Sequence, residues 1–218
     1  MPQVHGAVRG ALKHLRDVVE IETGSATDNP LVFEDGAAVS GGNFHGAPLA
    51  IGFDYAAIAM TDLISIGERR IDRLVNPHVN EGLPPFLSAQ PGLSSGYMIA
   101  QVCSVALLNE ARVLAHPASI DSVPTSGDKE DHVSMGMTAA LKLRQIVTNA
   151  ELALAIEFLA AAEGLDYRAP LRSSQPVERA RTIIRGSVER LTADRPLSYD
   201  IERIATAIRQ GEFDEFVA

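Results

Sequence analysis

Apolar residues recur at three- and four-residue intervals along most of this chain, which is the spacing of helices with one buried face. The pattern predicts four long helices, over about residues 4–22, 48–75, 95–114 and 132–162. The last two are apolar nearly all round, so we expect them to be buried on most sides. Several helices of this length favour an elongated bundle over a compact pack of short helices.

The sequence becomes more charged, and its helical stretches shorter, after Gly164. Pro176 begins a short amphipathic helix, and Ser198 can cap a last one, because a serine oxygen accepts hydrogen bonds from the free amides of a first turn. We therefore expect an all-α fold in two parts. Residues 1–163 would form the central long-helix bundle, and residues 164–218 a peripheral C-terminal helical subdomain.

One small β hairpin interrupts this pattern. Leu31-Val32-Phe33 and Ala37-Ala38-Val39 are short apolar runs joined by the turn sequence Glu34-Asp35-Gly36. The next segment, Ser40–Gly46, is rich in glycine, which indicates backbone passing close to another helix or a ligand. The usual fate of phenylalanine favours instead a plain loop with Phe44 in the core. The segment lacks the Gly-Lys-Ser/Thr of a phosphate-binding loop.

A second polar segment, from Ser119 to Gly136, lies between two long apolar stretches. Val123-Pro124 interrupts any preceding helix, because proline has no amide hydrogen and restricts the residue before it. The residues that follow suit either of two structures. Acidic groups near a helix N-terminus are favourable, so the segment could simply be the start of a helix. Alternatively, a polar loop could present Glu130 to a cleft between helices.

Composition narrows the class of protein. The 218 residues include 28 acidic and 19 basic ones, a net charge of −9, which argues against a nucleic-acid partner. A single cysteine, Cys103, fits a reducing compartment. The first twenty residues have no signal-peptide pattern, and the most apolar runs are broken by Gln101 and Glu157. We expect a cytoplasmic protein with no membrane partner.

Two groups of charged or ligand-type residues have plain explanations. The 6 histidines form no metal-binding pattern, and Glu130 and His132, two residues apart, would point away from each other on a helix. We therefore expect no metal. Arg69, Arg70 and Arg73 form a basic cluster on the second long helix, which salt bridges explain better than an anion site.

Five motifs, spread over most of the chain, carry a family resemblance. They are Pro2-Gln3-Val4-His5-Gly6, Thr27-Asp28-Asn29-Pro30-Leu31, Ser40-Gly41-Gly42-Asn43-Phe44-His45, Tyr97-Met98-Ile99-Ala100-Gln101 and Lys129-Glu130-Asp131-His132-Val133-Ser134-Met135-Gly136. With these motifs in this order, the chain resembles the C-terminal half of the histidine ammonia-lyases, in the aromatic amino-acid lyase family.

The resemblance implies a fold and an activity. The fold would be the long-helix superhelical bundle of the aspartase-like lyases, assembled as a homotetramer whose active sites mix residues of several subunits. The intact enzyme would eliminate ammonia from L-histidine to give trans-urocanate, in histidine degradation. Its electrophile would be 4-methylidene-imidazol-5-one, which the family forms from an internal Ala-Ser-Gly.

The resemblance also implies roles for individual residues. Glu130 would be the catalytic residue, partly buried near the cofactor and the substrate imidazole, and Phe44 would line their pocket. Asn29 and His45 would form hydrogen bonds or orient other groups. His45 and Glu130 match the histidine branch, because the phenylalanine and tyrosine lyases typically have glutamine or another residue at the first position and glutamine at the second. Lys129 departs from the glutamine often found there, without altering this assignment.

The chain has no Ala-Ser-Gly, since its Ser-Gly pairs follow Val39, Ser94 and Thr125. The cofactor segment, the catalytic tyrosine and the carboxylate-binding arginine of the family would lie in an N-terminal half, the expected partner, and this chain would be inactive alone. The chain would then be an expressed fragment, a split gene product or a truncated remnant, and the sequence agrees with each of the three. Two other functions stay open, a non-catalytic helical assembly domain and a phenylalanine or tyrosine ammonia-lyase or aminomutase.

Overall fold

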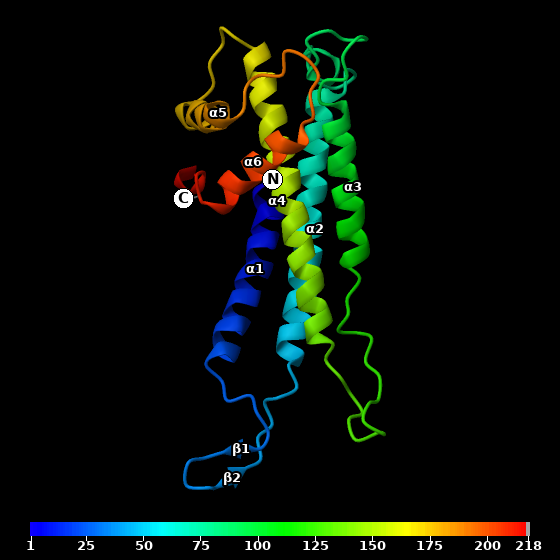
Figure 1. The fold of residues 1–218 in the computed structure, drawn as a ribbon, viewed down its shortest axis with the longest axis vertical. Coiled ribbons are helices and arrows are strands. Elements are labelled where there is room, and N and C mark those ends of the chain that lie inside the picture. Colours follow the sequence, from blue (N-terminus) through cyan, green and yellow to red (C-terminus); the bar gives the residue numbers. More distant parts are fainter. Residues whose placement is uncertain (217–218) are drawn as a thin grey trace. The chain divides into compact units, whose positions relative to one another are not determined.

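The computed structural model describes residues 1–216, and its regular secondary structure over this range is almost entirely helical (Figure 1). The predicted all-α class with one small hairpin is confirmed. The α-helices are α1 (Pro2–Thr23), α2 (Ala47–Val75), α3 (Met98–Leu114), α4 (Gly136–Tyr167), α5 (Gln175–Ser187) and α6 (Ser198–Arg209). Two short 3-10 helices complete the fold: η1 (Pro85–Leu87) lies between α2 and α3, and η2 (Asp214–Phe216) follows α6.

The hairpin forms where the two short apolar runs and the turn between them predicted it. Strand β1 (Leu31–Val32) pairs antiparallel with β2 (Ala38–Val39), with Leu31 opposite Val39. The turn between them is closed by the amide of Gly36, which donates to the carbonyl of Phe33. Gly36 has a φ of +81°, a conformation that glycine adopts without steric cost.

Several helix ends differ from the prediction. Helix α4 begins at Gly136 rather than His132, because Met135 takes a left-handed φ of +57°, and it continues past Gly164 to Tyr167. The segment that contains Glu130 and His132 is therefore a loop, and the expectation that they face apart on a helix is wrong. Ser198 lies inside α6, whose N-terminus has no side-chain cap, so the predicted serine cap is also wrong.

The chain divides into two compact units. Unit 1 comprises residues 1–63 and 111–147, and unit 2 comprises residues 64–110 and 148–218. This division cuts across α2 and α4 and does not test the predicted boundary between residues 163 and 164, which stays a prediction.

Small residues allow close packing in unit 1. Ala50, Ala56 and Ala57 of α2 are fully buried. A Cβ added at Gly52 would lie 3.3 Å from Cδ1 of Leu15, so α1 passes near α2 at this glycine. A side chain larger than glycine would force the neighbour to move.

Unit 2 has the larger apolar core. Its buried side chains come from α2 to α6 and the segments between them, and they include Ile71, Tyr97, Ile156 and Ile204. Phe158 and Phe213 pack edge to face, with ring centroids 4.8 Å apart. Two of the clustered arginines form the predicted salt bridges, Arg69 with Glu68 and Asp72, and Arg70 with Glu157.

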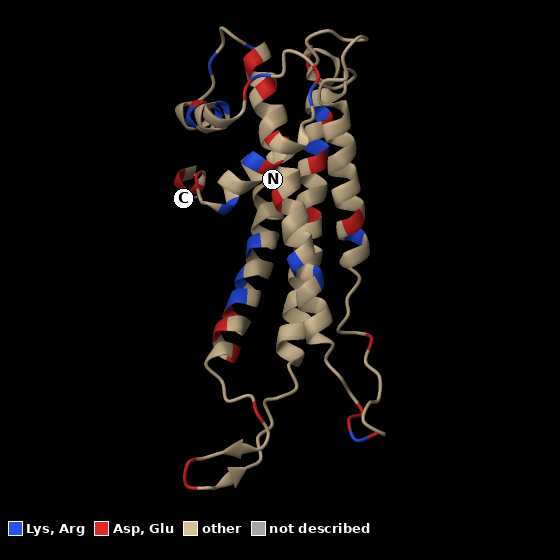
Figure 2. Cartoon of the chain, viewed as in Figure 1, with Lys and Arg blue, Asp and Glu red and all other residues tan. Residues whose placement is uncertain are grey.

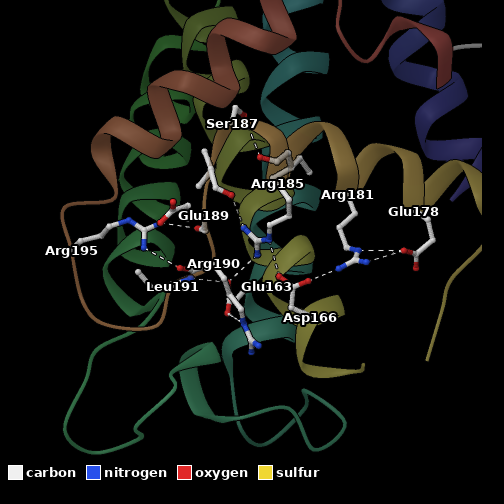
Figure 3. Close-up of polar contacts among 12 residues, drawn as sticks. Glu163, Asp166, Glu178, Arg181, Arg185, Ser187, Glu189, Arg190, Leu191 and Arg195 are labelled. Atoms are coloured by element: carbon white, nitrogen blue, oxygen red, sulfur yellow. Dashed lines mark hydrogen bonds and ion pairs between the residues drawn. The ribbon is translucent and has the colours of Figure 1, made fainter. Parts of the chain in front are cut away.

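A buried ionic network joins α4 to the segments that follow it in unit 2 (Figure 3). Glu163, fully buried, accepts from Arg185 at 2.9 Å, from Arg190 at 3.0 Å and from the amide of Leu191 at 3.2 Å. Asp166, one turn later, pairs with Arg185 at 2.7 Å and with Arg181 at 2.5 Å. A buried carboxylate needs such partners to remain charged.

Helix α3 is less buried than its composition predicts. Ile99, Val102 and Val113 are 61%, 57% and 71% exposed, so the expectation of burial on most sides is wrong for this helix. Helix α4 agrees better with the expected burial, since its Ile146, Ile156 and Leu159 are buried.

By length and composition alone, helices α2 and α4 are both able to cross a membrane. Core helices of other proteins pass the same test. Here α2 carries the buried carboxylates Asp54 and Glu68, and α4 carries Glu163. Charged groups of this kind are costly in a lipid environment, which favours the core-helix interpretation.

Candidate functional site

Two loops of unit 1 carry all the side chains that the sequence singled out. The first joins α1 to α2 and includes the hairpin and the glycine-rich segment (residues 24–46), which we call the hairpin loop. The second joins α3 to α4 (residues 115–135), and we call it the acidic loop. Figure 1 shows both at the same end of the helices of unit 1.

Asn29 holds the base of the hairpin loop together. Its Oδ1 accepts hydrogen bonds from the amide of Gly41 at 3.0 Å and from Oγ of Ser40 at 3.1 Å. A Cβ at Gly41 would lie 3.0 Å from the carbonyl of Asp28, so the two segments touch backbone to backbone here. The structure therefore assigns this side-chain oxygen to a local orienting role.

Phe44 is exposed rather than buried. Its side chain is 55% accessible, which rules out the plain interpretation that placed it in the core. Gly46, two residues later, has a φ of +75° and turns the chain into α2. The hairpin loop thus leaves the ring of Phe44 accessible to a ligand or another chain.

Glu130 lies at the base of a tight turn in the acidic loop. The amide of Thr125 donates to the carbonyl of Glu130 at 2.9 Å, and Oγ1 of Thr125 lies 3.4 Å from Oε2 of Glu130. The turn residues Ser126, Gly127 and Asp128 are all left-handed, with φ of 53°, 66° and 63°. The segment is a loop rather than the start of a helix, and Glu130 is exposed on it. Its partial burial in an intact enzyme stays a prediction.

His45 links the two loops. Its Nε2 lies 2.9 Å from the carbonyl oxygen of His132, and the two imidazole rings stack at 5.4 Å between centroids and 3° between planes. Because a carbonyl only accepts, Nε2 of His45 must carry the hydrogen. His45 and Phe44 are adjacent in sequence, and His132 is two residues from Glu130. This contact therefore brings the predicted site residues into one region.

A buried charged pair anchors the acidic loop to the helices of unit 1. Asp54 of α2 accepts the amide of Ser119 through Oδ2 at 2.8 Å, and Nζ of Lys142 of α4 lies 3.6 Å from its Oδ1. Lys142 also donates to the carbonyl of His116. Nearer Glu130, Oγ of Ser122 accepts the amide of Val133 at 2.8 Å.

Sequence reasoning missed Asp54, Lys142, Ser122 and His132. An aspartate inside the apolar run Ile51–Ala57 is the one signal that was available, since an unpaired carboxylate would be costly there. The role of His132 rests on a backbone carbonyl, which leaves no mark in the sequence.

The region has an acidic character (Figure 2). The acidic loop carries Asp121, Asp128, Glu130 and Asp131 against one lysine, Lys129, and the hairpin turn adds Glu34 and Asp35. Acidic side chains favour a ligand that donates hydrogen bonds or carries positive charge. A bare phosphate would be repelled.

Comparison with known proteins gives a consistent result. The family profile described as "Aromatic amino acid lyase" matches residues 1–186. The histidine ammonia-lyase of Anaeromyxobacter sp. (strain K) is 55% identical over 212 residues, 97% of this chain and 42% of that protein. That of Geobacillus kaustophilus is 52% identical over 217 residues, 100% of this chain and 43% of that protein. The chain thus spans less than half the length of these relatives.

Solved structures show the same fold. A histidine ammonia-lyase from Trypanosoma cruzi matches 97% of this chain and 42% of its own, with a TM-score of 0.91 and 43% identity. A tyrosine aminomutase from Streptomyces globisporus matches 98% of this chain and 41% of its own, with a TM-score of 0.91 and 42% identity. These matches confirm the long-helix fold type that the sequence resemblance implied.

Proposed function

Because the chain belongs to the aromatic amino acid lyase family, we propose that it supplies part of the active site of an enzyme that eliminates ammonia from L-histidine to give trans-urocanate. The observation that carries the proposal is the joining of two loops. Phe44 and Glu130, both exposed, lie on segments that His45 and His132 hold together. Histidine ammonia-lyases at 55% and 52% identity support the choice of substrate.

The residues of this chain would bind and orient the substrate. Glu130 would accept a hydrogen bond from an imidazole N–H, which fixes the side chain of histidine and so orients its β-carbon for loss of a proton. The ring of Phe44 would cover one face of the substrate and keep water away. Asn29 would act indirectly, by holding Ser40 and Gly41 in place.

The proposed cofactor is 4-methylidene-imidazol-5-one, an electrophile that binds the substrate amino group and makes it a better leaving group. The described residues could contact such a group, because they offer a carboxylate and an aromatic face, but they do not form it. The parent tripeptide Ala-Ser-Gly does not occur in this sequence. The group would come from the N-terminal half of the enzyme, which we propose as the partner, in a cytoplasmic homotetramer.

A second candidate is an aminomutase or lyase for tyrosine or phenylalanine. The fold favours it as much as the first, since the Streptomyces globisporus aminomutase matches with the same TM-score, 0.91. A carboxylate at residue 130 argues against phenylalanine as the substrate, because a benzene ring has no hydrogen to donate to that group, whereas the phenol hydroxyl of tyrosine has one.

A chimeric enzyme tests the proposal. The matched 42% of the Anaeromyxobacter protein is replaced by this chain, and turnover of histidine, tyrosine and phenylalanine is measured. Glu130→Gln should lower kcat for histidine by about a hundredfold, the scale of lost acid–base or orienting help. Asp128→Asn is the matched control, since it removes the same charge from the same loop. Unchanged turnover in Glu130→Gln would remove Glu130 from the site, and turnover of tyrosine alone would favour the second candidate.

A further inference from the structure

The two imidazoles of the loop junction are not equivalent. His45 contributes a ring nitrogen, and His132 contributes its backbone carbonyl and a stacking surface. Because Nε2 of His45 already donates to that carbonyl, this nitrogen is committed within the protein and is not available to a substrate. The family resemblance left open whether His45 donates to a ligand or orients other groups, and the geometry favours the second role.

The junction lies close to Glu130 along the chain. Only Asp131 separates Glu130 from His132, and the next amide, that of Val133, is held by Ser122 at 2.8 Å. On the other side, the carbonyl of Glu130 accepts the amide of Thr125. Glu130 therefore lies between two fixed points. One belongs to its own turn, and the other depends on the side chain of His45 in the hairpin loop.

We propose that His45 is a positioning residue that fixes the acidic loop, and with it the carboxylate of Glu130, against the hairpin loop that carries Phe44. Its importance for catalysis rests on the proposed function, but its effect on the loop does not. The stack on His132 holds the imidazole plane, and the Nε2–H hydrogen bond supplies the directional constraint. Loss of the hydrogen bond should free the acidic loop while the helices remain intact.

Two substitutions separate the donor from the ring. His45→Phe keeps a planar ring that can stack and removes the donor, whereas His45→Gln keeps an N–H donor and removes the ring. Amide hydrogen exchange in the intact chain is then followed over residues 126–133. We expect exchange there to be about tenfold faster in His45→Phe, the scale of one lost hydrogen bond, and close to wild type in His45→Gln. His78→Leu, at an exposed histidine in unit 2, is the control and should change nothing in this segment.

The outcomes divide clearly. Unchanged exchange in His45→Phe would overturn the proposal, as would equally fast exchange in both variants, since the donor would then not be what fixes the loop. A second test uses the wild-type chain, so its result does not depend on the folding of any variant. Nitrogen-15 NMR should find the Nε2–H form of His45, and the Nδ1–H tautomer would contradict the hydrogen bond.

Turnover in the chimeric enzyme shows how the loop acts on catalysis. His45→Phe should lower kcat for histidine about tenfold with little change in KM, and His45→Gln should restore it. A rise in KM without loss of kcat would mean that His45 contacts the substrate, and would overturn the positioning role. If the wild-type chimera forms no urocanate while the exchange results hold, the proposed function fails and the loop junction stands.

Discussion

Arg185 of α5 donates through Nη2 to Oε2 of Glu163 of α4 at 2.9 Å, and this carboxylate has no exposed surface. Nε of Arg190 donates to Oε1 and the amide of Leu191 to Oε2, so both oxygens of this carboxylate are hydrogen-bonded (Figure 3). Removal of one member of a buried network leaves its partners charged and unpaired, which costs more than the network itself contributes.

Glu163→Gln should therefore destabilise the chain by about 3–5 kcal/mol, the cost of breaking a buried ion pair from one side. Urea unfolding followed by circular dichroism measures this change. Asp17→Asn is the control, because the Lys13–Asp17 pair on α1 is exposed and should contribute no more than about 0.5 kcal/mol. A free energy of unfolding of Glu163→Gln within error of Asp17→Asn would mean that the network does not hold α5 to α4.

Tyr97 predicts the direction of an alkaline pH effect. Burial raises the pKa of its hydroxyl well above the usual value of 10, and the nearby charge of Glu163 adds to the effect. At a pH between the unfolded and folded pKa values, the folded chain keeps a proton that the unfolded chain has lost. The stability from this group is complete below pH 10 and decreases as the pH rises above it.

Tyr97→Phe should remove this dependence. Above pH 10, the free energy of unfolding of the wild type should fall relative to Tyr97→Phe by about 1.4 kcal/mol per pH unit. Tyr199→Phe is the control, since Tyr199 is 76% exposed and should keep the wild-type slope. Parallel curves for wild type and Tyr97→Phe would contradict burial of the hydroxyl.

The backbone conformation at residue 96 requires glycine. It has a φ of +55°, and a Cβ there would lie 2.5 Å from the carbonyl of Phe86 and 3.0 Å from Cα of Ser88. Gly96→Ala should destabilise the chain by about 2 kcal/mol or more, through strain at this φ and the displaced backbone.

The same substitution at Gly10 has the opposite expected sign. Gly10 lies inside α1 with nothing within 4 Å of an added Cβ, so alanine there should stabilise the chain by up to about 1 kcal/mol. Thermal unfolding of the two variants side by side measures both effects. Equal changes in the two would mean that the approach of Gly96 to Phe86 is not required.

Most of the fold could be predicted because a helix with one buried face has apolar residues at regular three- and four-residue intervals in the sequence. Val4, Val8, Ala11 and Leu15 are spaced as one helix face, and two of them, Val8 and Ala11, are buried. The start of α3 could not be predicted in the same way. The amides of Ser95 and Gly96 donate hydrogen bonds to the carboxylate of Asp194, almost one hundred residues away. The spacing of apolar residues does not reveal such a contact.

The site was predicted less completely. Family motifs identified Asn29, Phe44, His45 and Glu130. Without them, the usual burial of phenylalanine favoured a buried Phe44 and spacing favoured a helical Glu130, and both are wrong. The left-handed φ of Met135 explains the second error, since a non-glycine residue in that conformation has no signature in sequence. The roles of the four residues in catalysis stay predictions until turnover is measured.

The central claim is that this chain is part of a lyase site, and complementation in trans tests it most directly. The chain is expressed alone, and with the part of the Anaeromyxobacter histidine ammonia-lyase that it does not match, and urocanate formation from histidine is followed. We predict activity in the mixture and none in either part alone. A well-folded complex that forms no urocanate would contradict the account and leave the chain as an assembly domain of the lyase fold.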